Sequence, residues 1–362
     1  MYTDRQPNTL FNLDGDATRM TQWIVQGSNG PFVPIFMSDR PMLEISDPFG
    51  FTTAPMFQVT AAQSQGRQPD YENALIGYQP IDLAHLVRYT KAAMTLVWLG
   101  NDALAKDDLR MQAEIFRFSY HWMPNDSTGY LQTTGLADAQ VEVAANPGEG
   151  FNFGRREGWG LNVSNAAYAL ADDNWRAESR PWYGMVMDLV DDGQMTCTGI
   201  IQNQPFPHLF DAQYRCRQEI EAAILENALM GMRETVFAGN DPERVAQCDE
   251  VLIDTLYSRV NAPVWNPAYG GPEAMMATAP ANVNQPPYCT YVPADGSYGF
   301  RNTSLQWSSL AYGYELTGDE LFLNRAAQSL GGNNIAPLIT NAAMEDINNR
   351  APLLALIQAI QP

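Results

Sequence analysis

Ionisable side chains stand where helices are expected to begin, at spacings that suit acid–base chemistry. Asp82 and His85 lie one helical turn apart, just after Pro80. A carboxylate one turn from an imidazole can orient it for proton transfer. The same two residues also fit a capping aspartate followed by a histidine packed between helices. Both interpretations of the pair stay open.

The densest group of candidate residues lies in the segment 153–162, which reads FGRREGWGLN. Arg156, Trp159 and Asn162 fall at helical spacing behind a glycine-flanked turn. A guanidinium fork suits a carboxylate, and the aromatic face suits a sugar ring. Glu157 is the best candidate for a general acid, yet a glutamate in the first turn of a helix is also typical of a capping box.

Two later segments repeat the pattern of aromatic and basic residues ahead of a helix. His208 lies among prolines and aromatic residues just before a predicted helix. It can carry a proton there, or it can be an ordinary loop residue. Tyr298, Arg301 and Trp307 surround the start of the last predicted pair of helices. We therefore take His85, Arg156, Glu157 and Tyr298 as catalytic candidates. The substrate-binding candidates are Asp82, Trp159, Asn162, His208, Arg301 and Trp307.

A turn signal that recurs four times predicts the elements that position these residues. A helix-periodic stretch ends in Gly, Asn or Asp near residues 100, 172, 239 and 318, and a second helical stretch follows. The final aspartates of the copies are Asp102, Asp173, Asp241 and Asp319, and each suits a helix N-cap. The predicted pairs of helices are 81–99 with 103–121, 157–171 with 174–190, 209–237 with 241–260, and 303–316 with 319–330, and a short helix is expected at 351–360.

This repeat of helical hairpins predicts an all-α fold, an α/α toroid or an incomplete toroid of at least four hairpins. Residues 80–362 form the toroid domain in this prediction. Residues 1–79 form a short strand-containing or extended segment that packs on it, with strands near 22–25, 32–36 and 57–60. The long connections 122–154, 191–208 and 261–302 are expected to meet at one end of the helices, where the candidate site would lie.

Composition excludes several classes of protein. The 362 residues carry a net charge of −20, which repels nucleic acid and anionic membrane surfaces. No apolar stretch is long enough to span a bilayer, and the first residues show no signal peptide. Three histidines and four scattered cysteines make a metal site improbable, and no cofactor motif occurs. Buried free thiols are the default for the cysteines, with one or two disulfides if the protein is secreted.

Three motifs resemble a bacterial family of α/α-toroid proteins: DLAH at 82–85, REGWGL at 156–161 and YELTGD at 314–319. The resemblance covers roughly residues 80–330. Fold neighbours of that family include polysaccharide lyases, hydrolases and epimerases. The resemblance implies a carbohydrate-related activity, in which Arg156 would neutralise a uronate carboxylate and Trp159 and Trp307 would stack on sugars. The proton would be taken by Tyr298 or His85, and Tyr120 with His121 is a further candidate pair.

Two hypotheses of function follow, and the sequence leaves open whether the protein is an enzyme. The first is an extracellular or cell-surface protein that binds a polysaccharide or oligosaccharide and cleaves it by β-elimination or hydrolysis. Hydrolysis would need a second acid beside Glu157, either Asp82 or Asp211. The second is a non-catalytic structural or adhesive module, with self-association through the N-terminal segment.

Overall fold

The computed structural model describes residues 24–26, 32–34, 91–118, 121–125, 130–134, 136–205, 213–282, 285–293, 299–300 and 305–332. The chain divides into two compact units, Met1–Thr134 and Gly135–Pro362. The boundary predicted after residue 79 lies outside the described residues. None of the described helices is long and apolar enough to cross a membrane.

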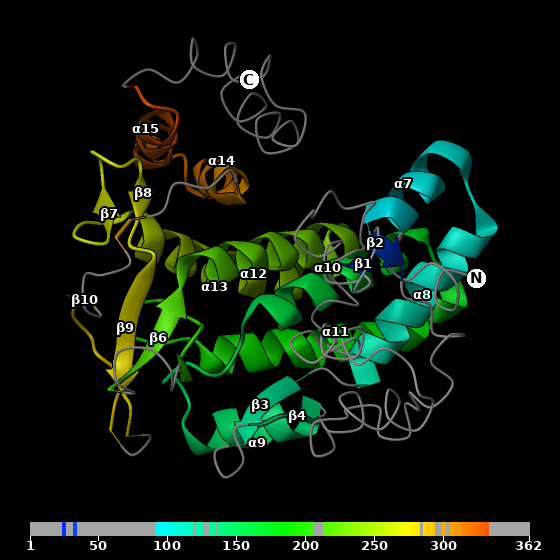
Figure 1. Cartoon of the computed structure of the whole chain (residues 1–362), viewed down its shortest axis with the longest axis horizontal. Helices are drawn as coiled ribbons and strands as arrows, with labels where there is room; N and C mark the ends of the chain where they lie inside the picture. Colours follow the sequence, from blue (N-terminus) through cyan, green and yellow to red (C-terminus); the bar gives the residue numbers. More distant parts are fainter. Residues whose placement is uncertain are drawn as a thin grey trace. The chain divides into compact units, whose positions relative to one another are not determined.

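The described residues of unit 1 form a helical hairpin and two short pairs of strands (Figure 1). The elements are β1 (Ile24–Gln26), β2 (Phe32–Pro34), α7 (Lys91–Gly100), α8 (Ala103–Phe118), β3 (His121–Asn125) and β4 (Tyr130–Thr134). Both strand pairs, β1 with β2 and β3 with β4, are antiparallel. Strand β1 overlaps the strand predicted near 22–25, and β2 lies within the one predicted near 32–36. The third predicted strand, 57–60, falls outside the described residues.

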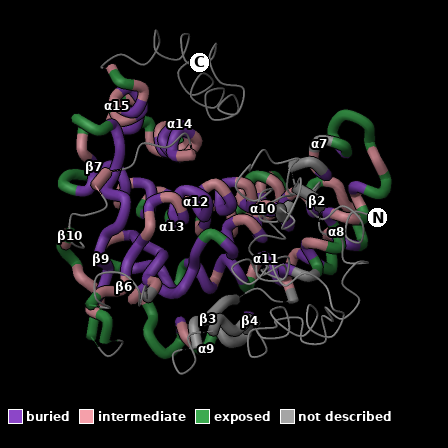
Figure 2. The backbone as a smooth tube through the Cα atoms, in the orientation of Figure 1, coloured by how far each residue is buried: buried purple, intermediate pink, exposed green. Residues whose placement is uncertain are grey.

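Unit 2 is mostly helical (Figure 1). Its helices are α9 (Leu136–Ala145), α10 (Arg155–Leu170), α11 (Asp173–Gly193), α12 (Glu219–Met232), the π-helical turn η4 (Arg233–Phe237), α13 (Pro242–Val260), α14 (Leu305–Thr317) and α15 (Glu320–Ser329). Helix α12 packs against α10, α13 and α14, and its tube is largely in the buried colour (Figure 2). It is therefore the central helix of this unit.

Close packing between α10 and α12 depends on a glycine. A Cβ on Gly158 would lie 3.0 Å from the backbone nitrogen of Leu225 and 2.9 Å from Cγ2 of Ile224. Any larger residue at this position would push the two helices apart, because backbone atoms cannot move aside as a flexible side chain can. Asn165 completes the contact by donating a hydrogen bond to the carbonyl oxygen of Ala228 at 2.9 Å.

An antiparallel sheet lies beside the helices of unit 2, in the strand order β10-β9-β6-β5. Its strands are β5 (Gln204–Pro205), β6 (Tyr214–Gln218), β9 (Met275–Pro280) and β10 (Val292–Pro293). A separate pair, β7 (Trp265–Asn266) and β8 (Gly271–Pro272), is also antiparallel. Strand β6 pairs with β9 along its length and leads directly into α12.

The predicted all-α toroid is wrong. The sheet forms from segments assigned to structureless connections and from residues 214–218, which were expected to be helical. These five residues, YRCRQ, hydrogen-bond to β9, some 60 positions later, and helical periodicity within the segment cannot reveal that partner. No toroid is evident in the part of the chain that the structure describes.

The four predicted turns do separate consecutive helices. The side chains of Asp102, Asp241 and Asp319 accept hydrogen bonds from backbone N–H groups at the start of α8, α13 and α15. In the second turn the cap is Asp172 rather than Asp173, since Asp172 accepts from the N–H of Trp175. Segments of the three long connections also meet, because Asn203 donates to the carbonyl oxygen of Glu149 and accepts from Thr278.

The cysteines divide into two kinds. Cys197 and Cys289 form a disulfide, whereas Cys216 and Cys248 are buried free thiols. The default expectation of free thiols thus holds for the second pair and is wrong for the first.

Candidate functional site

Four buried charged residues lie where β6 passes into α12. Arg217 is near the end of the strand, Glu219 begins the helix, and Glu226 follows seven residues later. Arg259 comes from the last turn of α13. None of the four is more than 3% exposed. We call Arg217, Glu219, Glu226 and Arg259 the buried quartet.

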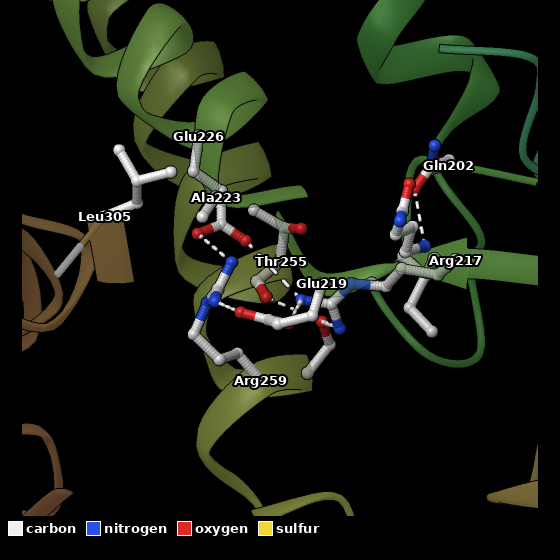
Figure 3. Close-up of polar contacts among 12 residues, drawn as sticks. Gln202, Arg217, Glu219, Ala223, Glu226, Thr255, Arg259 and Leu305 are labelled. Atoms are coloured by element: carbon white, nitrogen blue, oxygen red, sulfur yellow. Dashed lines mark hydrogen bonds and ion pairs between the residues drawn. The ribbon is translucent and has the colours of Figure 1, made fainter. Parts of the chain in front are cut away.

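The carboxylates of the quartet lie between its two guanidinium groups (Figure 3). One Nη of Arg217 lies 3.2 Å from Oε2 of Glu219 and 3.7 Å from Oε1 of Glu226. Arg259 pairs with Glu219, and its Nη2 lies 2.6 Å from Oε2 of Glu226. Two positive and two negative groups therefore compensate one another away from water.

Burial is the main cause of the pKa shifts within the quartet. Loss of solvation raises the pKa of Glu226 to about 7, against the opposing effects of the Arg217 charge and of a hydrogen bond with Ser309. Burial also lowers the pKa of Arg217, and burial together with the charge of Arg217 lowers the pKa of Arg259 well below its ordinary value. A carboxyl pKa near neutrality is common at proton-transfer sites. A side chain only 1% exposed cannot meet a substrate directly.

The quartet therefore acts as a structural junction in unit 2. It joins the end of β6, the start of α12 and the end of α13. Its outward link is Ser258, whose hydroxyl oxygen accepts a hydrogen bond from Nη1 of Arg217 at 3.3 Å and whose hydroxyl donates to the carbonyl oxygen of Thr255 at 2.6 Å.

A second buried carboxyl, Glu221, belongs to a neighbouring network. Its Oε2 accepts from Nε2 of Gln202 at 2.6 Å, and its Oε1 lies 3.5 Å from Nε of Arg155. Burial raises the pKa of Glu221, and Arg155 and Gln202 oppose that effect. The oxygen of Gln202 in turn accepts from the backbone N–H of Gln218 at 2.8 Å. This network fixes the strand–helix junction from the other side.

The two catalytic candidates on α10 are buried. Arg156 is 1% exposed and Glu157 is 2% exposed. Oε2 of Glu157 accepts a hydrogen bond from the backbone N–H of Gly154 at 3.0 Å, which is the capping-box contact. Of the two interpretations of Glu157, the structure therefore supports the cap.

The described substrate-binding candidates do not form one surface for a sugar. Trp307 is 8% exposed and its indole N–H donates to Oγ of Ser329 at 2.8 Å, so its ring is packed between α14 and α15. Trp159 and Asn162 on α10 are half-buried. The remaining candidates, Asp82, His85, His208, Tyr298 and Arg301, lie outside the described residues.

Metal binding finds no support in the part of the chain that the structure describes. No group of three or more His, Cys, Asp or Glu side chains there is arranged to hold a metal ion.

The quartet was missed in the sequence because Arg259 lies 33 positions after Glu226, although the other three members are close together along the chain. A signal was present in α12, where Glu219, Glu221 and Glu226 interrupt a helix otherwise rich in Ala, Leu, Ile and Met. A carboxylate placed between apolar neighbours on every side must be buried, and a buried carboxylate needs a cationic partner. That reasoning predicts partners, but it does not identify Arg217 and Arg259.

No known protein family, curated protein or solved structure matches this chain. A proposal of function therefore depends on the geometry of the described residues.

Proposed function

We propose that this chain is a non-catalytic assembly module, and that it associates with a second copy of itself through the hairpin of α7 and α8. The observation that carries the proposal is a concentration of exposed apolar side chains. Eight large apolar side chains are exposed among the described residues, and five of them lie on this hairpin. They are Leu96, Trp98, Leu99, Leu104 and Met111, which we call the apolar hairpin surface.

These side chains are widely exposed, and the hairpin that carries them is well formed. Trp98 is 69% exposed, Leu99 85% and Leu104 70%. Asn101 takes a left-handed conformation with φ of 52° and Asp102 caps α8. Single exposed apolar residues are ordinary, but a group of them on one element is typical of an interaction surface.

A second copy is the partner whose charges fit this surface. On the outer face of α8 the exposed residues are Leu104, Asp107, Arg110, Met111 and Glu114, so charges of both signs flank the apolar side chains. A two-fold interface requires a self-complementary surface, and opposite charges one turn apart on a helix provide one when two helices run antiparallel. Arg110 would repel a strongly basic partner, so the charges on this face fit a second copy better.

The burial of Arg156 and Glu157 also supports a non-catalytic role. Both are within the helical unit, and Glu157 is engaged as a helix cap. An acid and a carboxylate-binding arginine need contact with the polymer they act on. Neither of these two candidate residues is therefore accessible to a polymer.

The double variant Trp98→Ser/Leu99→Ser tests the interface. We expect the wild type to form dimers or larger oligomers at micromolar concentration in analytical ultracentrifugation. The variant is expected to bind itself at least 100-fold more weakly, because each of the two apolar anchors that it removes is worth about 2 kcal/mol. Val141→Ser and Tyr269→Ser, which remove exposed apolar side chains elsewhere, should leave association unchanged.

Salt provides an independent measurement on the wild type. Each copy carries a net charge of −20, so added salt should strengthen the association by screening repulsion between copies. A wild type that stays monomeric at every concentration and ionic strength would contradict the proposal.

An absorbance assay tests the non-catalytic part. Purified protein mixed with a panel of uronate polysaccharides is expected to give no rise in the ultraviolet absorbance of an unsaturated product. A rise that Arg156→Ala abolishes would restore the lyase hypothesis and overturn the proposal.

A further inference from the structure

A cavity of about 240 Å³ lies beside the disulfide of unit 2. Its described lining comes from four segments that are distant in sequence, 197–200, 258–264, 276–278 and 288–291. The second segment contains the end of α13 and the third belongs to β9. The cavity therefore lies where the sheet, the helices and the disulfide-linked loop meet.

The floor of the cavity is apolar. Ile200, Val264 and Met276 are each at most 9% exposed and pack together with Met195, and Tyr291 packs against this cluster. Ala277 is 3% exposed. An apolar floor of this kind suits the C–H face of a ring.

Hydroxyl and amide groups also line this cavity. They belong to Thr198, Ser258, Asn261, Tyr288, Thr290 and Tyr291. The described lining contains no aspartate, glutamate, lysine or arginine. A second described cavity, of about 350 Å³, differs in this respect because Asp188 and Asp192 line it. The first cavity is therefore suited to a neutral ligand with several hydroxyl groups.

Two of the polar groups are held in place by buried partners. The hydroxyl of Ser258 donates to the carbonyl of Thr255, while its oxygen accepts from Arg217 of the buried quartet and keeps a further lone pair. The hydroxyl of Tyr291 donates to Glu273. A polar group whose position is fixed before binding loses less conformational entropy when a ligand arrives.

We infer that this cavity is a binding site for a single neutral sugar ring. Its volume of about 240 Å³ provides room for one ring. The apolar floor faces the ring and the hydroxyl and amide groups meet its hydroxyls. The residues that line this cavity differ from those of the apolar hairpin surface, and binding is not expected to require self-association.

The disulfide fixes one wall of this site. Cys289 is bonded to Cys197, and the residues next to Cys289, namely Tyr288, Thr290 and Tyr291, carry much of the polar lining. The backbone N–H of Tyr288 also donates to the carbonyl oxygen of Thr278 at 2.8 Å. Removing the disulfide should loosen this wall and weaken binding.

Saturation-transfer NMR with glucose, N-acetylglucosamine and glucuronate tests the inference, followed by a titration of the best binder. We expect transfer from at least one of the two neutral sugars and a weaker signal from glucuronate. Thr290→Trp places a large side chain in the lining and should lower affinity at least tenfold. Gln140→Trp makes the matched change at the second cavity and should leave affinity unchanged.

Two further variants keep the test decisive. Asn261→Ala removes one exposed amide and should lower affinity several-fold even if Thr290→Trp does not fold. Cys197→Ser/Cys289→Ser should weaken binding, and a reducing agent added to the wild type should weaken it as well. Absence of transfer from both neutral sugars, stronger binding of glucuronate, or equal affinity in folded Thr290→Trp would overturn the inference.

Discussion

Replacing Arg259 by methionine is expected to lower the free energy of unfolding by about 3–5 kcal/mol, because it leaves a buried charge uncompensated. Arg259 is fully buried and pairs with both carboxylates of the quartet. Methionine fills a comparable volume, so the loss of charge dominates over the loss of packing. Urea denaturation of the two proteins at neutral pH measures the difference.

Arg244→Met is the matched control on the same helix. Arg244 is partly exposed and pairs with Asp188, so its loss should cost less than about 1 kcal/mol. The double variant Arg259→Met/Glu219→Gln removes one charge of each sign and should recover part of the stability lost by Arg259→Met alone. The single variant Glu219→Gln completes the comparison. If the double variant loses as much unfolding free energy as the two single variants lose together, charge compensation does not stabilise the quartet.

Stability is also expected to fall as the pH rises from about 5 to 8, through the titration of Glu226. The pKa of Glu226 is about 7 in the folded protein, whereas the ordinary pKa of a glutamate, which applies to the unfolded chain, is 4.5. The folded state therefore binds the proton more tightly than the unfolded state between these values, and unfolding becomes easier as the proton is lost. The difference amounts to a maximum of about 3 kcal/mol, at about 1.4 kcal/mol for each factor of ten in proton affinity. Burial raises the pKa of Glu221 as well, which acts in the same direction.

Glu226→Gln separates this effect from the general repulsion of an acidic chain. Glutamine resembles the protonated carboxyl, so thermal or urea unfolding of the variant should depend much less on pH over this range. Glu250→Gln removes an exposed carboxylate from α13 and should keep the wild-type dependence. A wild type that becomes more stable from pH 5 to 8 would mean that the ion pairs outweigh burial.

The local parts of the fold could be predicted from the sequence, whereas the pairing between distant segments could not. Three of the four aspartate caps are those predicted, since a cap depends on residues two or three positions away. The sheet escaped prediction because β6 and β9 are separated by the whole of α12 and α13. Residues such as Cys216 and Met276 do not reveal in the sequence which strand they will join.

The roles of Arg156 and Glu157 could not be decided from the sequence for a related physical reason. The same first-turn position suits a catalytic glutamate and a capping glutamate, and only the contact between Glu157 and the N–H of Gly154 distinguishes them. Arg156 likewise has the type that binds carboxylates, but at 1% exposure it belongs to the interior. Exposure and partners are properties of the packed chain, and residue type with spacing does not determine them.

The link between Cys197 and Cys289 closes a covalent loop with a sequence separation of 92 residues. This loop contains β6, α12, α13 and β9, and with them every member of the buried quartet. A protease that cuts one peptide bond inside the loop therefore does not release a fragment. The nicked chain should run as one band on a non-reducing gel and as two after reduction, so after a single cut the parts of the charged junction stay covalently linked until a reductant is added.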